Sequence, residues 1–127
     1  MDLAQQVCSL ELAKQLKALG VKQDSCFYWG SNNDVFQPME PDTNKYVVCS
    51  AFTVAELGEM LPNHLEQDGY WFLSEIRTES NKWDVAYTNR TDTTRLFNVN
   101  ESNEANARAK ALIYLIENNL LPVPPDK

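Results

Sequence analysis

The sequence is poor in the residues from which most catalytic and metal sites are built. It has one histidine, His64, and three widely spaced cysteines, Cys8, Cys26 and Cys49. A Ser–His or Cys–His nucleophilic pair would have to use His64, which lies in the polar segment PNHLEQDG, where an exposed loop is expected. No CxxC, HxxxH or Asp-x-Asp spacing suggests metal ligands, and four glycines form no phosphate-binding loop. We therefore expect no metal, no cofactor and no enzymatic activity.

Basic residues and long apolar runs are also scarce. Eleven Lys and Arg residues against eighteen Asp and Glu residues give a formal net charge of −7. Because non-specific binding to nucleic acids requires clustered positive charge, scattered basic residues argue against a nucleic-acid partner. No apolar run approaches the ~20 residues that span a membrane. The acidity favours solubility, with mimicry of nucleic-acid charge by a small inhibitor as an alternative.

The N-terminal segment MDLAQQVCSLELAKQL has no basic stretch followed by an apolar run, so no signal peptide is expected. The three cysteines are then predicted to be reduced, mostly buried thiols of a cytoplasmic protein.

What the sequence does contain is the pattern of an α+β domain. The 127 residues predict a single domain over 1–121 and a proline-rich C-terminal tail over 122–127. We expect a mainly antiparallel sheet of four to five strands, with about three helices packed mostly on one face. The first expected helix begins near residue 2 or near residue 9 and ends at 19, and the others lie near 53–61 and 104–120. The expected strands lie near 26–29, 35–37, 46–52, 70–78 and 82–88, with a further short strand as an option near 95–98.

The register of one hairpin follows from its side chains. If Ser80 and Asn81 form a two-residue connection, Glu79 faces Lys82 and Arg77 faces Asp84. Apolar pairs then fall on the opposite face, where Ile76 meets Val85, Thr78 meets Trp83 and Ser74 meets Tyr87. Opposite charges and apolar residues each favour such pairing, so a slip by one residue would spoil both sets.

The segment TVAELGEMLP predicts a short helix with a defined start and end. Thr53 and Glu56 form a capping box, and Pro62 is a stop signal. Gly58 weakens this helix by about 1 kcal/mol relative to Ala. Because Gly58 shares a face with Val54 and Leu61, we expect it to permit close packing, with a strand aromatic as the expected neighbour.

The aromatic residues supply the candidates for a binding site, because some of them are expected to lie outside the core. In the predicted register Tyr70 and Phe72 point toward the helices, so Trp71 and Leu73 project to the opposite face with Arg77. This pair is either covered by the segment 30–45 or exposed as an apolar patch rimmed by charge, which is how partner sites look. The candidate binding residues are Trp71, Leu73, Arg77 and Trp29. A pocket among Trp29, Trp71 and Trp83 is the alternative.

Three stretches resemble a known group of proteins: LELAKQLKALGVKQDSCFYW, YVVCSAFTVAELGEMLP and ESNEANARAKALIYLIENNL. They are similar to small proteins encoded by gut Bacteroidales, including Bacteroides, and by their prophages. The resemblance covers most of the chain and implies a bacterial cytoplasm and an origin in a phage or mobile element. It implies no mechanism. Together with the missing catalytic motifs, it leads us to expect a non-catalytic domain that binds an unidentified protein partner, with small-molecule or peptide binding as the alternative.

Overall fold

The computed structural model describes residues 3–32, 35–40, 46–67, 70–79, 81–89, 91–92 and 94–121, with the backbone alone for a few strand residues, Trp71 among them. The tail expected at 122–127 lies outside the described residues. The helices are α1 (Leu3–Gln6), α2 (Leu10–Ala18), α3 (Val54–Met60) and α4 (Glu104–Glu117). The strands are β1 (Phe27–Asn32), β2 (Val35–Met39), β3 (Tyr46–Ala51), β4 (His64–Gln67), β5 (Tyr70–Glu79), β6 (Lys82–Asn89) and β7 (Arg95–Glu101).

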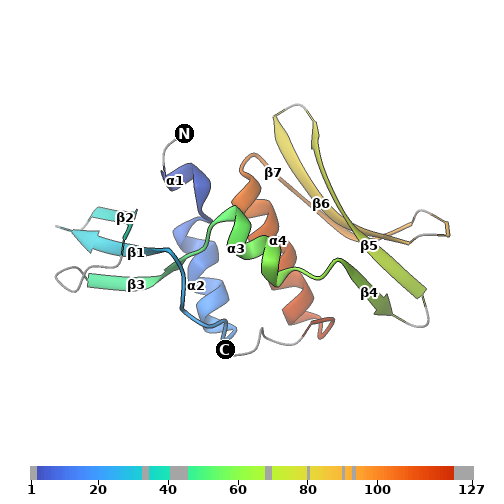
Figure 1. The fold of residues 1–127 in the computed structure, drawn as a ribbon, viewed down its shortest axis with the longest axis horizontal. Coiled ribbons are helices and arrows are strands. Elements are labelled where there is room, and N and C mark those ends of the chain that lie inside the picture. Colours follow the sequence, from blue (N-terminus) through green and yellow to red (C-terminus); the bar gives the residue numbers. More distant parts are fainter. Residues whose placement is uncertain are drawn as a thin grey trace.

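The fold is α+β with antiparallel pairing, as predicted, but its strands form two sheets instead of one. The small sheet has the order β2-β1-β3, and the large sheet has the order β4-β5-β6-β7. Figure 1 shows the two sheets on either side of the helices. The helices therefore lie between the sheets and not mostly on one face of a single sheet.

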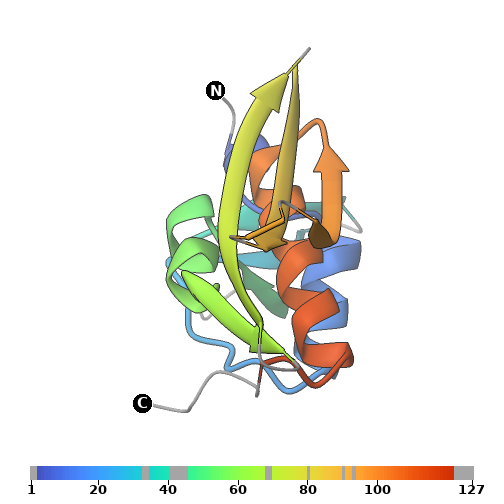
Figure 2. The ribbon, with the colours of Figure 1, turned by 90° about the vertical axis from the view of Figure 1, so that its right-hand side faces the viewer.

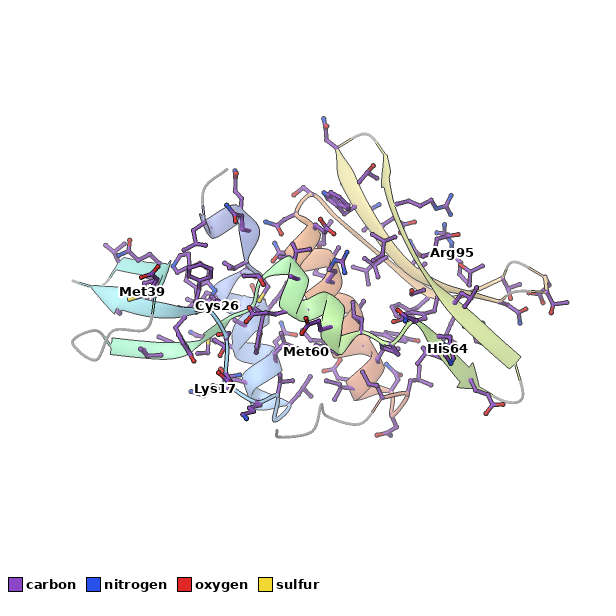
Figure 3. All side chains as sticks on the ribbon, viewed as in Figure 1. Lys17, Cys26, Met39, Met60, His64 and Arg95 are labelled. Atoms are coloured by element: carbon purple, nitrogen blue, oxygen red, sulfur yellow. The ribbon has the colours of Figure 1, made fainter. Side chains whose placement is uncertain are left out.

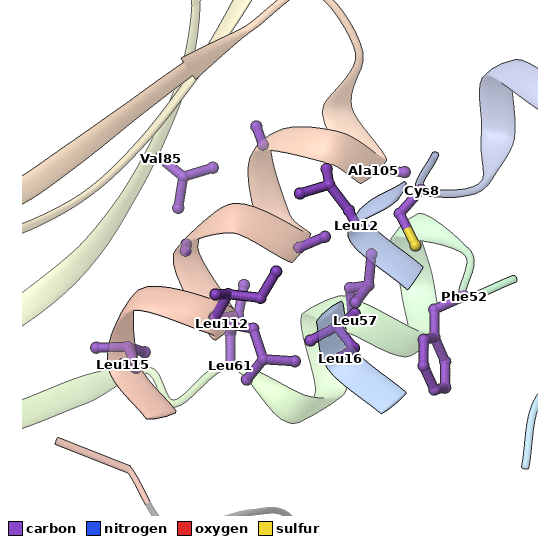
Figure 4. Close-up of a cluster of buried hydrophobic side chains, with 14 of the residues drawn as sticks. Cys8, Leu12, Leu16, Phe52, Leu57, Leu61, Val85, Ala105, Leu112 and Leu115 are labelled. Carbon is purple, nitrogen blue, oxygen red and sulfur yellow. The ribbon is translucent and has the colours of Figure 1, made fainter. Parts of the chain in front are cut away.

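Helix α4 lies at the centre of this arrangement and is buried on most of its circumference. Its buried residues are Ala105, Ala107, Ala109, Ala111, Leu112, Ile113 and Leu115. Alternate alanines extend the buried surface around the helix, beyond the side on which its larger apolar residues lie. Because alanine adds little volume, α2 and α3 can approach α4 from one side while β6 and β7 pack on another. Figure 4 shows this core.

The long hairpin formed by β5 and β6 has the predicted register. Glu79 faces Lys82, Arg77 faces Asp84 and Ile76 faces Val85. Val85 is buried, whereas Ile76, which the register pairs with it on the apolar face, is 36% exposed. The reason is that α4 packs on β6 and β7, so the strand that carries Val85 is covered, whereas Ile76 lies on the neighbouring strand β5. Strand alternation determines the face on which a side chain lies, but not which strands of that face a helix covers.

The ends of the helices follow the local sequence signals. Ser9 caps α2, and Gly20 follows that helix in a left-handed conformation with φ 95°. Asn103 caps α4 by accepting a hydrogen bond from the N–H of Asn106. The capping box of α3 is present, with Thr53 Oγ1 accepting from the N–H of Glu56. These termini needed only local chemistry, which is why the sequence predicts them.

The neighbour of Gly58 differs from the expected one. A Cβ atom added at Gly58 would lie 2.6 Å from Nη1 of Arg108, a residue of α4. The close approach is therefore between two helices, and the group above the glycine is a guanidinium and not a strand aromatic. Arg108 Nη2 and Nε bond Oε2 of Glu104 one turn earlier, at 2.7 and 3.0 Å.

Candidate functional site

One face of the large sheet carries a network of paired charges. We call it the outer face because α4 packs on the opposite face; its described members are His64, Glu66, Leu73, Glu75, Arg77, Asp84, Ala86, Thr88, Arg95, Asn98 and Asn100. Arg95 lies 3.2 Å from Asp84 Oδ2 and 3.5 Å from Glu75 Oε1, and Arg77 lies 2.8 Å from the same Glu75 oxygen. Two arginines thus balance two carboxylates. The network carries no net charge, although the whole protein carries −7.

The ion pairs differ from those suggested by the register. Arg77 and Asp84 are cross-strand neighbours, but Arg77 bonds Glu75 on its own strand, and Asp84 bonds Arg95 and the side-chain amide of Asn98. Sequence reasoning missed the role of Arg95. No sequence signal indicated it, because a register shift between Tyr87 and Thr88 places Arg95 opposite Thr88, where unbroken pairing would place Leu96.

Leu73 is the exposed apolar residue beside this network. Its side chain is 41% exposed, whereas Phe72 next to it is 9% exposed and packs in the core. The backbone of Trp71 lies in β5 and pairs with Glu66, and its side chain lies outside the described part of the structure. The segment 30–45 was the expected alternative cover for this face. Its described residues 30–32 and 35–39 instead belong to the small sheet.

Trp29 is not part of the same surface as Leu73 and Arg77. It lies in β1 of the small sheet, and its indole N–H donates to the carbonyl of Cys8 at 3.0 Å. The helices separate the two sheets in Figure 1. Trp29 is half-buried and packs against the core. The four candidate residues therefore do not form one site.

A groove of about 630 Å³ lies between α1, the starts of α3 and α4, and β6. Its lining residues are Gln5, Gln6, Thr53, Val54, Ala55, Trp83, Ser102, Asn103 and Glu104. Trp83 is the aromatic member, and Trp29 does not line the groove. The alternative pocket among three tryptophans is thus not formed with Trp29, and the side chain of Trp71 lies outside the described residues.

The three thiols are protonated at neutral pH. Burial raises the pKa of Cys8 to about 12 and also raises that of Cys49. Cys26 is exposed, and the negative charge of Glu56 beside it raises its pKa. Since the thiolate is the reactive form, these environments disfavour nucleophilic chemistry. None of the three cysteines forms a disulfide.

His64 lies in β4, where the sequence suggested a loop. The strand forms because His64–Gln67 pairs with β5 and buries Leu65, an interaction that the polar local sequence does not reveal. Figure 3 shows His64 and Cys26 at opposite sides of the helices, so these two residues do not form a catalytic pair. Among the residues that the structure describes, no group of three His, Cys, Asp or Glu side chains is placed to hold a metal ion.

Comparison with known proteins provides no relative from which a function could be transferred. No family model, no curated protein and no solved structure matches the chain. In the described part of the chain, no helix has both the length and the apolar character required to cross a membrane.

Proposed function

We propose that this protein is a non-catalytic protein–protein interaction domain that binds its partner through the outer face of the large sheet. Leu73 supplies an apolar contact, and Arg77 supplies part of a polar rim. Trp71 is included because residues 71 and 73 share a face by strand alternation in the sequence. The observation that carries the proposal is an exposed leucine beside a charge network that is already neutralised.

The pairing of these charges matters for the energetics of binding. Burying an unpaired charge in an interface is costly, whereas Glu75 and Asp84 each keep an arginine partner when water is removed. A large apolar side chain beside such a rim resembles the anchor of many protein interfaces. The outer face can therefore be covered with a smaller desolvation cost than an equally charged but unpaired surface.

The proposed setting is the cytoplasm of a bacterium, with an origin in a phage or mobile element, and it follows from the resemblance to proteins of gut Bacteroidales. The proposed partner is a protein of that host or phage. Nucleic acid is not proposed as a partner, since the chain carries an excess of seven negative charges.

The test is affinity capture with wild-type protein, followed by binding measurements on the purified partner. Leu73→Asp and Trp71→Asp place a new charge on the proposed contact and should each abolish binding. Val35→Asp is the matched control, because Val35 is 59% exposed but belongs to the small sheet. Unchanged binding by Leu73→Asp, or equal loss by Val35→Asp, would refute the outer face as the contact.

A second candidate function rests on the groove beside Trp83. Its volume of about 630 Å³ falls in the range of small-molecule sites, and an indole offers a flat surface for an aromatic ligand or a short peptide. Ala55 is an exposed residue of α3 that lines the groove, so Ala55→Arg should block it. Ligands found by thermal-shift screening should lose binding in this variant. Retained binding would place the ligands elsewhere.

A further inference from the structure

The two sheets have four edge strands, and three of them are poorly suited to pair with another strand. An edge strand presents alternate backbone N–H and C=O groups to solvent, and proteins usually shorten or block such edges. In the large sheet, β4 has only four residues. In the small sheet, both edges carry specific obstructions.

The edge of β2 is blocked by Pro38. The connection from β1 to β2 has two residues, so Asn32 and Val35, which close the hairpin, form a hydrogen-bonded pair. Hydrogen-bonded and non-hydrogen-bonded pairs alternate from there, and the backbone of residue 38 therefore points away from β1. A proline there offers no N–H. The edge of β3 is occupied by side chains, because the N–H of Ser50 donates to Gln23 Oε1 at 2.7 Å and the carbonyl of Val48 accepts from Lys17 Nζ at 2.8 Å.

Among the described residues, nothing obstructs the edge of β7 in a comparable way. The N–H of Asn89 donates to the carbonyl of Thr94 at 2.7 Å, so the odd-numbered residues of β6 turn their backbone groups toward β7. Their partners are the odd-numbered residues of β7 from 97 to 101. Asn98 and Asn100 therefore turn their N–H and C=O groups away from the sheet. Figure 2 shows β7, in orange, at the side of the sheet away from β4.

No described residue occupies these outward backbone groups of Asn98 and Asn100. The register of β6 and β7 shifts between Tyr87 and Thr88, so the regular stretch of β7 runs from 97 to 101. It contains no proline. Within the part of the chain that the structure describes, these five residues are available to pair with another strand.

We infer that β7 is a dimerisation edge, on which a second copy of this chain adds its own β7 in antiparallel orientation. The centre of the regular stretch is Val99, so a two-fold axis through Val99 pairs all five residues of one β7 with the same five residues of the other. Asn98 then faces Asn100 of the second copy, and both can exchange backbone hydrogen bonds. Phe97 faces Glu101 of the second copy, so the two Glu101 carboxylates do not oppose each other.

The side chains of β7 on the side of α4 favour contact with a second copy of the chain over contact with water. Phe97 and Val99 are half-buried at the border of the core, and the Phe97 ring stacks on Tyr114 of α4 with centroids 4.1 Å apart. A second β7 would bring Phe97 and Val99 of the other copy beside them and cover apolar surface that now borders solvent. The two large sheets would join into one sheet, with both outer faces on the same side.

The test is analytical ultracentrifugation of the full chain over a wide range of concentrations. Wild-type protein should show a reversible monomer–dimer equilibrium, and higher salt should tighten it, because two copies of charge −7 repel each other. Asn98→Pro removes an outward N–H without touching the bonds to β6, and should raise the dimer dissociation constant about tenfold or more.

Asn98→Ala is the matched control. It deletes the side chain, including its bond to Asp84, but keeps the backbone donor, so it should dimerise nearly as the wild type does. Hydrogen exchange supplies a measurement that needs no variant: the amides of Asn98 and Asn100 should gain protection as protein concentration rises. A wild type that stays monomeric, equal dimerisation of Asn98→Pro, equal loss in Asn98→Ala, or unchanged exchange would each overturn the inference.

Discussion

Replacing Gly58 with alanine should destabilise the protein although alanine is the better helix former. The added Cβ would lie 2.6 Å from Arg108 Nη1 and 3.7 Å from its Cζ, so the guanidinium must move. That guanidinium is held by Glu104, and the two side chains are only 18% and 21% exposed. The substitution therefore opposes a gain in helix propensity to the loss of a largely buried ion pair.

The two effects have comparable size, so the sign of the change in the free energy of unfolding depends on whether Arg108 is present. Alanine should gain about 1 kcal/mol from helix propensity. Displacing the tip of Arg108 and weakening its charged hydrogen bonds should cost about 2 kcal/mol. The expected net loss is about 1 kcal/mol. It is limited because the obstructing atom is the end of a flexible side chain and not backbone.

A double-mutant cycle separates these effects. In an Arg108→Ala background the obstruction is gone, so Gly58→Ala should stabilise the protein by about 1 kcal/mol. Ala55→Gly, at an exposed position in the first turn of the same helix, calibrates the propensity; it should cost at most about 1 kcal/mol, and the same amount in both backgrounds. Urea unfolding of the set provides the free energies. An equal effect of Gly58→Ala with and without Arg108 would refute the proposed contact.

Four further predictions concern the thiols, pH, the outer face and nucleic acid. A thiol reagent should count three free cysteines in denaturant but should react quickly with Cys26 alone in the native protein; a denatured count of one would show a disulfide. Because burial raises the pKa of Cys8 from 9.0 to about 12 and raises that of Tyr87, these groups favour folding below pH 9, and chemical denaturation should show stability falling as pH rises from there toward 12. Phe72→Ala should lower the free energy of unfolding by about 3–5 kcal/mol and Leu73→Ala by clearly less; equal losses would mean that Leu73 is internal. Random-sequence DNA should not be retained at ~0.15 M salt, and steeply salt-dependent retention would contradict the expected absence of a nucleic-acid partner.

Features that depend on neighbouring residues could be predicted from the sequence alone. The capping box of Thr53 and Glu56 and the left-handed Gly20 each require only a few adjacent residues. The register of the long hairpin also followed from the sequence, because a two-residue connection links strands whose apolar and charged residues match only in one alignment.

The placement of candidate binding residues was predicted only in part. Leu73 and Arg77 share a face, as strand alternation indicated, because alternation fixes which side chains lie on the same side of a strand. Whether Leu73 is exposed or covered was left open by the sequence, and the structure shows it 41% exposed. Alternation cannot reveal that Trp29 and Leu73 belong to different sheets. It also cannot reveal that Arg95 joins Glu75 and Asp84, since that network depends on how a third strand pairs.

The division into two sheets was decided by tertiary packing around α4. The sequence shows an apolar stripe on this helix, but alanines at 107 and 111 bury further sides only because other elements approach there. The same packing turns the polar segment at His64 into a strand and puts Arg108, from a helix fifty residues away, above Gly58. Local propensity determines whether a segment can form a helix or strand. Which surfaces meet depends on the shapes and volumes of segments distant in the sequence, and these interactions exist only once the chain has folded.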